Sequence, residues 1–125
     1  MENKNIQEGL RLTVVKTINN NELASTIGTS RSQTLSTSAL ILFIEKTIFS
    51  LIEPYLSEDE TSVSSEINIK HFKAANENET IRCTVHLKYV ENNKLFFDVA
   101  VFDEAHNEIA IGAHSRRIIK QKQQP

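Results

Sequence analysis

One segment of the chain, residues 37–55, is apolar on nearly every side when its residues are placed at helical spacing. Ser36 or Thr37 suits the N-cap, and Pro54 falls in the last turn, where it helps to end the helix. Three polar residues cluster on one narrow face, and apolar residues fill nearly all the rest: Lys46, Ser50 and Glu53. A helix on the surface of a globular protein has a wider polar arc. We therefore expect this helix to be mostly enclosed by a sheet that wraps around it.

Most of the remaining chain alternates between apolar and polar residues with the period of two that is typical of strands. A first strand is expected from Leu10 toward Ile18, and four more form a meander at about residues 63–71, 81–89, 95–102 and 109–119. The second strand turns one set of residues toward the helix: Val63, Ser65, Ile67, Ile69 and His71. The third strand likewise groups Ile81, Cys83, Val85, Leu87 and Tyr89. One long helix enclosed by a five-stranded antiparallel sheet is an α+β fold.

The size and composition exclude several classes of protein. At 125 residues the chain is expected to form a single domain, residues 1–125, with loose tails at 1–9 and 121–125. The net charge of −2 and the pI near 6.1 argue against a nucleic-acid partner, and no apolar run is long enough to span a membrane. The single cysteine, Cys83, cannot form an internal disulfide, and the start of the chain lacks a secretory signal. A cytoplasmic setting is therefore expected.

Glu45 lies in the middle of the apolar helix, and no helical neighbour can serve as its counter-charge. The residues three and four positions away are all apolar: Ile41, Leu42, Ile48 and Phe49. Because an unpaired buried carboxylate is very costly, this one must be neutral or find a partner elsewhere in the fold. Glu45 is therefore the first candidate for chemistry.

His71 is the second candidate, since the period of two turns it toward the helix that carries Glu45. A carboxylate and an imidazole that converge in a cleft of low dielectric can shift each other's proton affinity. Thr37 adds a hydroxyl beside the exposed backbone amides at the helix start. The alternatives are a hydrogen-bonded core histidine and a plain N-cap. No histidine pair, and no histidine with Cys83, has metal-ligand spacing, so no metal site is expected.

Three stretches of the chain resemble the fluoroacetyl-CoA-thioesterase-like branch of the hotdog-fold proteins. They are LSTSALILFIEKT at 35–47, SVSSEINIKHFKAA at 62–75 and IGAHSR at 111–116. The resemblance covers nearly the whole chain, from about residue 10 to 119, in order and without large gaps. The catalytic Thr, Glu and His of that branch fall on Thr37, Glu45 and His71 at the same separations.

The resemblance implies hydrolysis of acyl-CoA thioesters by a homodimer with its active sites at the subunit interface. The pairing of dimers into tetramers is left open. Glu45 would attack the thioester carbonyl or activate a water molecule, Thr37 would orient the carboxylate or the thioester, and His71 would carry the proton. Coenzyme A enters as part of the substrate, and no other cofactor is implied. The residues expected to contact the CoA part of the substrate are Arg116, His114, Ser64 and Ser65.

The chain departs from that branch at several points. Ser38 stands where the branch usually has Pro, Ser64 and Ser65 replace Gly-Thr, and residues 76–79 replace a turn with Pro and Gly. Ser64, Ser65 and the turn without glycine favour an alternative function, a non-catalytic acyl-CoA-binding or regulatory domain. A dehydratase acting on a hydroxyacyl thioester is a third, less favoured reading. Because the connection over residues 19–36 is shorter than the lid of the fluoroacetyl-CoA-specific enzyme and lacks its aromatic residues, that specificity is not expected.

Overall fold

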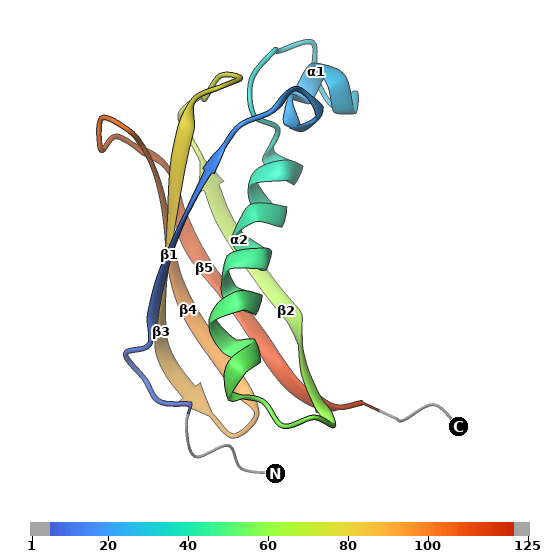
Figure 1. Ribbon diagram of the computed structural model, residues 1–125, viewed down its shortest axis with the longest axis vertical. Coiled ribbons are helices and arrows are strands. Elements are labelled where there is room, and N and C mark those ends of the chain that lie inside the picture. The colour runs from blue at the N-terminus through green and yellow to red at the C-terminus, as the bar shows by residue number, and fades with distance from the viewer. Residues whose placement is uncertain (1–5, 122–125) are drawn as a thin grey trace.

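The computed structural model describes residues 6–121, which form one antiparallel sheet with one long helix lying across it (Figure 1). In chain order, the elements are β1 (Arg11–Thr17), the 3-10 turn η1 (Asn20–Glu22), α1 (Ala24–Ile27), α2 (Thr37–Ile52), the 3-10 turn η2 (Glu53–Tyr55), β2 (Glu60–His71), β3 (Thr80–Glu91), β4 (Lys94–Asp103) and β5 (Glu108–Lys120). The strands are ordered β1-β3-β4-β5-β2. The expected meander of four strands is therefore wrong for β2, which pairs with β5 and not with β3, the next strand along the chain. The predicted α+β fold and the five-stranded antiparallel sheet are confirmed.

Helix α2 begins and ends where its local sequence requires. The Ser36 hydroxyl accepts a hydrogen bond from the backbone amide of Ala39 at 3.0 Å and so caps the first turn. Pro54 lies in η2, and α2 ends at Ile52. The predicted helix over residues 37–55 is therefore an α-helix to Ile52 followed by a 3-10 turn, because proline cannot donate the amide hydrogen that α-helical bonding requires.

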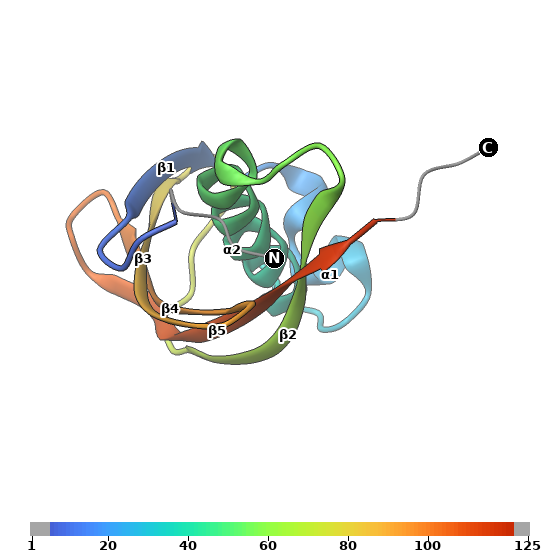
Figure 2. The same cartoon turned by 90° about the horizontal axis from the view of Figure 1, so that it is seen from below.

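The core lies between α2 and the concave face of the sheet, which curves around the helix in the view of Figure 2. Four isoleucines and leucines of α2 at helical spacing are completely buried: Leu40, Ile44, Ile48 and Ile52. Each contributes roughly 1.5–3 kcal/mol of stability through burial. They face inward residues of β3: Ile81, Cys83, Val85 and Leu87. This packing fixes α2, and therefore Thr37 and Glu45, against the sheet.

Two β-bulges change which residues face the helix. In β2 the pairing with β5 shifts between Ser64 and Glu66, so Ser62 and Ser64 face α2 while Val63, at 36% exposed, faces away. The prediction that Val63 and Ser65 face the helix was therefore wrong. A second shift in β3, between Leu87 and Tyr89, places Tyr89 outside, against Phe96. An extra residue in a strand reverses which later side chains face the helix, and a sequence pattern of strict alternation does not reveal such a residue.

Helix α2 is less enclosed than its sequence predicted. The side chains of Leu42 and Phe49 are 50% and 41% exposed, and Glu45 lies between them, half-buried. All three belong to one side of the helix, at successive helical spacings of three and four residues. That side of α2 is open in the single chain, because the sheet covers only the opposite side.

The connection between β1 and α2 folds over the end of the molecule where α2 begins and β2 ends (Figure 1). It contains η1 and α1, which the sequence pattern did not predict. Leu23 and Leu35 anchor it, since both are buried and pair in an isolated bridge. The Leu35 amide also donates to the carbonyl of Ala75 at 2.8 Å. Among residues 6–121, no helix is long and apolar enough to cross a membrane.

Candidate active site

Thr37 and His71 meet at the end of the molecule covered by this connection. Thr37 is the first residue of α2, and His71 is the last residue of β2. Their side chains form a hydrogen bond of 2.9 Å between Thr37 Oγ1 and His71 Nδ1. Partial burial lowers the pKa of His71 below its ordinary value of 6.5, although a backbone hydrogen bond at Lys73 opposes this effect. The imidazole is therefore neutral at pH 7 and able to accept a proton.

Glu45 belongs to a separate group of polar residues, further along α2. Its Oε2 accepts a hydrogen bond of 2.5 Å from the hydroxyl of Ser64 on β2. The eight residues from Thr37 to Glu45 advance the helix by about 12 Å. The convergence of Glu45 and His71 predicted from the sequence is thus not formed within a single chain, where each pairs with a different hydroxyl. The sequence indicated that Glu45 would need a partner from another element of the fold, and in the single chain its hydrogen-bond partner is Ser64.

Arg116 and His114 lie inside the molecule, on the face of β5 toward α2. The Arg116 side chain is 6% exposed and donates to three oxygens at 2.9 Å: Oγ of Ser62, the carbonyl of Ser62 and Oγ of Ser64. His114 is 2% exposed, with its Nε2 at 3.2 Å from the same Ser64 oxygen. In the single chain both side chains are buried and contact serines of β2. Their contact with the CoA part of the substrate, expected from the sequence, stays a prediction.

The charge states of these two residues follow from their burial. Burial lowers the pKa of His114 to about 4, assisted by the positive charge of Arg116 and opposed by Glu45. His114 is therefore neutral at pH 7. Burial also lowers the pKa of Arg116, an effect that the charges of Glu45 and Glu53 oppose. The guanidinium still carries its proton at neutral pH, because an arginine begins from such a high pKa.

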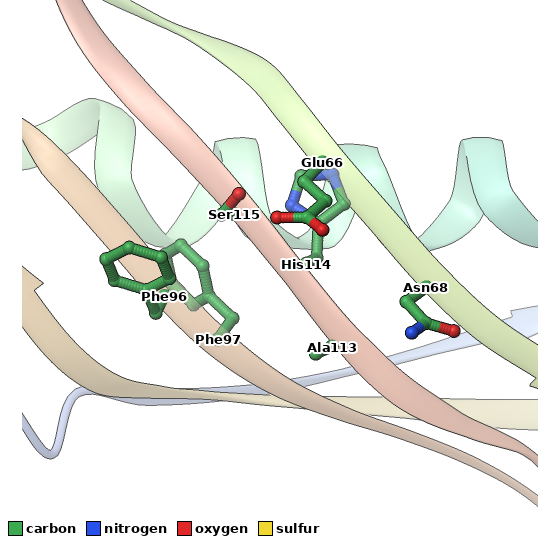
Figure 3. A pocket seen from close by; sticks show the side chains of 7 residues that line it. All are labelled: Glu66, Asn68, Phe96, Phe97, Ala113, His114 and Ser115. Carbon is green, nitrogen blue, oxygen red and sulfur yellow. The ribbon is translucent and has the colours of Figure 1, made fainter.

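Ser65, also expected to contact the substrate, bonds to Ser115 at 2.9 Å between the two hydroxyl oxygens. Ser115 alternates with His114 and Arg116 along β5, so this pair lies on the sheet face away from α2. A hollow on that outer face is shown in Figure 3, with α2 behind the sheet. Seven residues line it, and none of the three predicted catalytic residues is among them: Glu66, Asn68, Phe96, Phe97, Ala113, His114 and Ser115.

Sequence reasoning missed Ser62 and did not foresee that Ser64 would contact Glu45. The positions of both serines toward α2 depend on the bulge at Ser65, which the local sequence does not indicate. Within the described part of the chain, no three residues among His, Cys, Asp and Glu are grouped as metal ligands would be.

Comparison with known protein families shows to which family the chain belongs. A family model described as FlK, fluoroacetyl-CoA-specific thioesterase, matches residues 18–122. The chain belongs to the fluoroacetyl-CoA-specific thioesterase family. As a member of this family it is a thioesterase, a hydrolase that acts on thioester bonds. Comparison with curated proteins gave no significant match.

Solved structures confirm the hotdog fold of this thioesterase. A mutant of the fluoroacetyl-CoA-specific thioesterase FlK, in complex with fluoroacetate and CoA, is 22% identical, with a TM-score of 0.86 over 92% of this chain and 96% of that chain. A thioesterase superfamily member from Thermus thermophilus is 18% identical, with a TM-score of 0.86 over 94% and 87% of the two chains. A hot-dog-like protein from Thermanaerovibrio acidaminovorans is 20% identical, with a TM-score of 0.80 over 90% and 83%.

Proposed function

We propose that this thioesterase hydrolyses short or medium acyl-CoA esters, with Thr37, Glu45 and His71 as its catalytic residues. The observation that carries the assignment is the hydrogen bond between Thr37 and a neutral His71 at the start of α2. A hydroxyl beside a neutral imidazole is an arrangement suited to moving protons during acyl transfer. Membership in the family supports the thioester as the bond that is cleaved.

The start of α2 supplies the groups that a thioester carbonyl needs. The Ser36 hydroxyl accepts a hydrogen bond from the Ala39 amide, and the Ser36 carbonyl accepts one from the Leu40 amide. The amides of Thr37 and Ser38 donate no hydrogen bond among residues 6–121. These two amides, at the positive end of the helix dipole, would stabilise the oxyanion. The Thr37 hydroxyl would orient the thioester or the attacking carboxylate.

Glu45 would supply the attacking group, for which two routes remain open. In the first, its carboxylate adds to the carbonyl carbon, the C–S bond breaks, and water hydrolyses the resulting anhydride. In the second, the carboxylate takes a proton from a water molecule as the water oxygen bonds to that carbon. In both routes the CoA thiolate leaves with the electron pair of the C–S bond. The reacting water supplies the proton that His71 accepts and passes to this thiolate.

We propose that two chains form the complete site. Among residues 6–121, strand β2 is at the edge of the sheet and pairs only with β5, which leaves one side of its 12-residue backbone unpaired by them. Beside it, α2 exposes Leu42 and Phe49 around Glu45. Pairing of two β2 strands would cover this side of α2 and could bring Glu45 of one chain toward His71 of the other, which a single chain does not do.

The dimer is tested by its mass. Sedimentation equilibrium should give twice the 14.2 kDa of one chain. Phe49→Glu should weaken the dimer, because it places a charge in an apolar contact, and activity should fall with the dimer fraction. A wild-type monomer with full activity would overturn the shared site.

The function is tested by thiol release from a panel of acyl-CoA esters, from acetyl to long-chain, with aromatic acyl groups and fluoroacetyl-CoA included. We expect turnover of short or medium esters and no preference for fluoroacetyl-CoA. The alternative, a non-catalytic acyl-CoA-binding domain, is favoured by the pairing of Glu45 with Ser64 instead of His71. Esters that raise the melting temperature without releasing any thiol would decide for this alternative.

A further inference from the structure

The hydroxyl of Ser64 is the point at which three otherwise separate side chains meet. It donates to Glu45 Oε2 at 2.5 Å and accepts from Arg116 Nη1 at 2.9 Å, while His114 Nε2 lies 3.2 Å away. The three partners come from α2 and β5, and Ser64 itself is on β2. One hydroxyl thus links the proposed attacking carboxylate to two buried residues on the neighbouring strand, β5.

The hydrogen-bonding capacity of a hydroxyl determines how these contacts are arranged. A serine has one hydrogen to donate and two lone pairs to accept. A carboxylate only accepts and a guanidinium only donates, so Glu45 takes the hydrogen of Ser64 and Arg116 occupies one lone pair. His114 must then donate to the second lone pair, with its own hydrogen on Nε2. Its Nδ1 should be a bare acceptor, and this atom is indeed the unpartnered buried side-chain atom of the described residues.

Arg116 makes this junction rigid. Its guanidinium is held by the hydroxyl and the carbonyl of Ser62 as well as by Ser64. A planar group with three hydrogen bonds in the interior has little freedom to move. Glu45, in contrast, is half-buried on the open side of α2 and has no other hydrogen-bond partner among residues 6–121. The orientation of its carboxylate therefore depends on Ser64.

We infer that Ser64 is a positioning residue, whose hydroxyl holds the carboxylate of Glu45 in its reactive orientation by joining it to Arg116 and His114. This inference rests on the proposed function, because it assigns Glu45 to the reaction. The role differs from the substrate contact expected for Ser64 from the sequence. The bulge at Ser65 makes it possible, since it turns Ser64 toward α2.

Kinetics of three variants test the inference. Ser64→Ala should lower kcat by about tenfold to a hundredfold with KM changed less than about threefold, because the carboxylate is misplaced while the substrate site is intact. Ser64→Thr keeps the hydroxyl and should retain kcat within about threefold of wild type. The control is Ser115→Ala, which removes a buried hydroxyl from the opposite face of the sheet and should leave kcat unchanged. Equal losses in Ser64→Ala and Ser115→Ala, or none in Ser64→Ala, would overturn the inference.

A second measurement does not depend on activity. Nitrogen-15 NMR of His114 at pH 7 should identify the tautomer with its hydrogen on Nε2 in the wild type, and this preference should be lost in Ser64→Ala. A hydrogen on Nδ1 in the wild type would overturn the junction. If the wild type releases no thiol from any ester but shows the expected tautomer, the proposed function fails while the junction stands, so the two failures are distinguishable.

Discussion

Replacing Glu45 with glutamine should lower thioester hydrolysis by about a thousandfold or more while leaving the fold intact. The amide has the size of the carboxylate, and its oxygen can still accept the hydrogen of Ser64. It can neither attack a carbonyl carbon nor take a proton from water, so both proposed routes are blocked. Thiol release from the best ester of the panel, measured for the variant and the wild type, checks this result.

The control for Glu45→Gln is Glu91→Gln, which removes one negative charge at the exposed end of β3. It should hydrolyse the same ester at the wild-type rate. The urea midpoint of Glu45→Gln should lie close to that of the wild type, since no buried volume is lost. Full activity in a correctly folded Glu45→Gln variant would eliminate the assigned mechanism.

Removing either partner of the hydrogen bond between Thr37 and His71 should have the second large effect. We expect Thr37→Val, which keeps the side-chain shape but loses the hydroxyl, and His71→Asn each to lower kcat/KM by about a hundredfold to ten-thousandfold. Thr37→Ser keeps the hydroxyl and should be the least impaired. If the two residues act as a unit, the double variant should be scarcely worse than the poorer single variant.

The pH profile of kcat/KM should report on His71. Burial lowers its pKa, so the neutral form persists to a lower pH than it does for a free histidine. Activity should therefore be retained at pH 6.5 and be lost only as the pH falls through a midpoint below that value. His71→Asn should remove this limb of the profile, whereas Thr37→Val should retain it at a lower rate. A midpoint above pH 6.5 would contradict the assignment of this limb to His71.

The sequence by itself determined the elements of this protein and the positions of its candidate catalytic residues. A long apolar helix and the alternation along each strand are local patterns, and such patterns can be identified without a structure. Ser36 caps α2 as its position before the apolar run predicted, and the four later strands lie close to their expected ranges. The isolation of Glu45 among apolar neighbours left two outcomes open, a neutral carboxyl or a partner from elsewhere in the fold, and the structure supplies a hydrogen-bond partner, Ser64 on β2.

Only the tertiary structure decided how these residues are combined. Whether a strand contains an extra residue depends on its pairing with the neighbouring strand, and the bulge at Ser65 turned Ser64 toward Glu45 and Val63 away from it. Likewise, the burial of Arg116 depends on the hydroxyl and carbonyl that β2 provides across the sheet. The open side of α2 also depends on how the chain packs. Periodicity shows that a helical face is apolar, but only the packed chain shows whether its own sheet is wide enough to cover it.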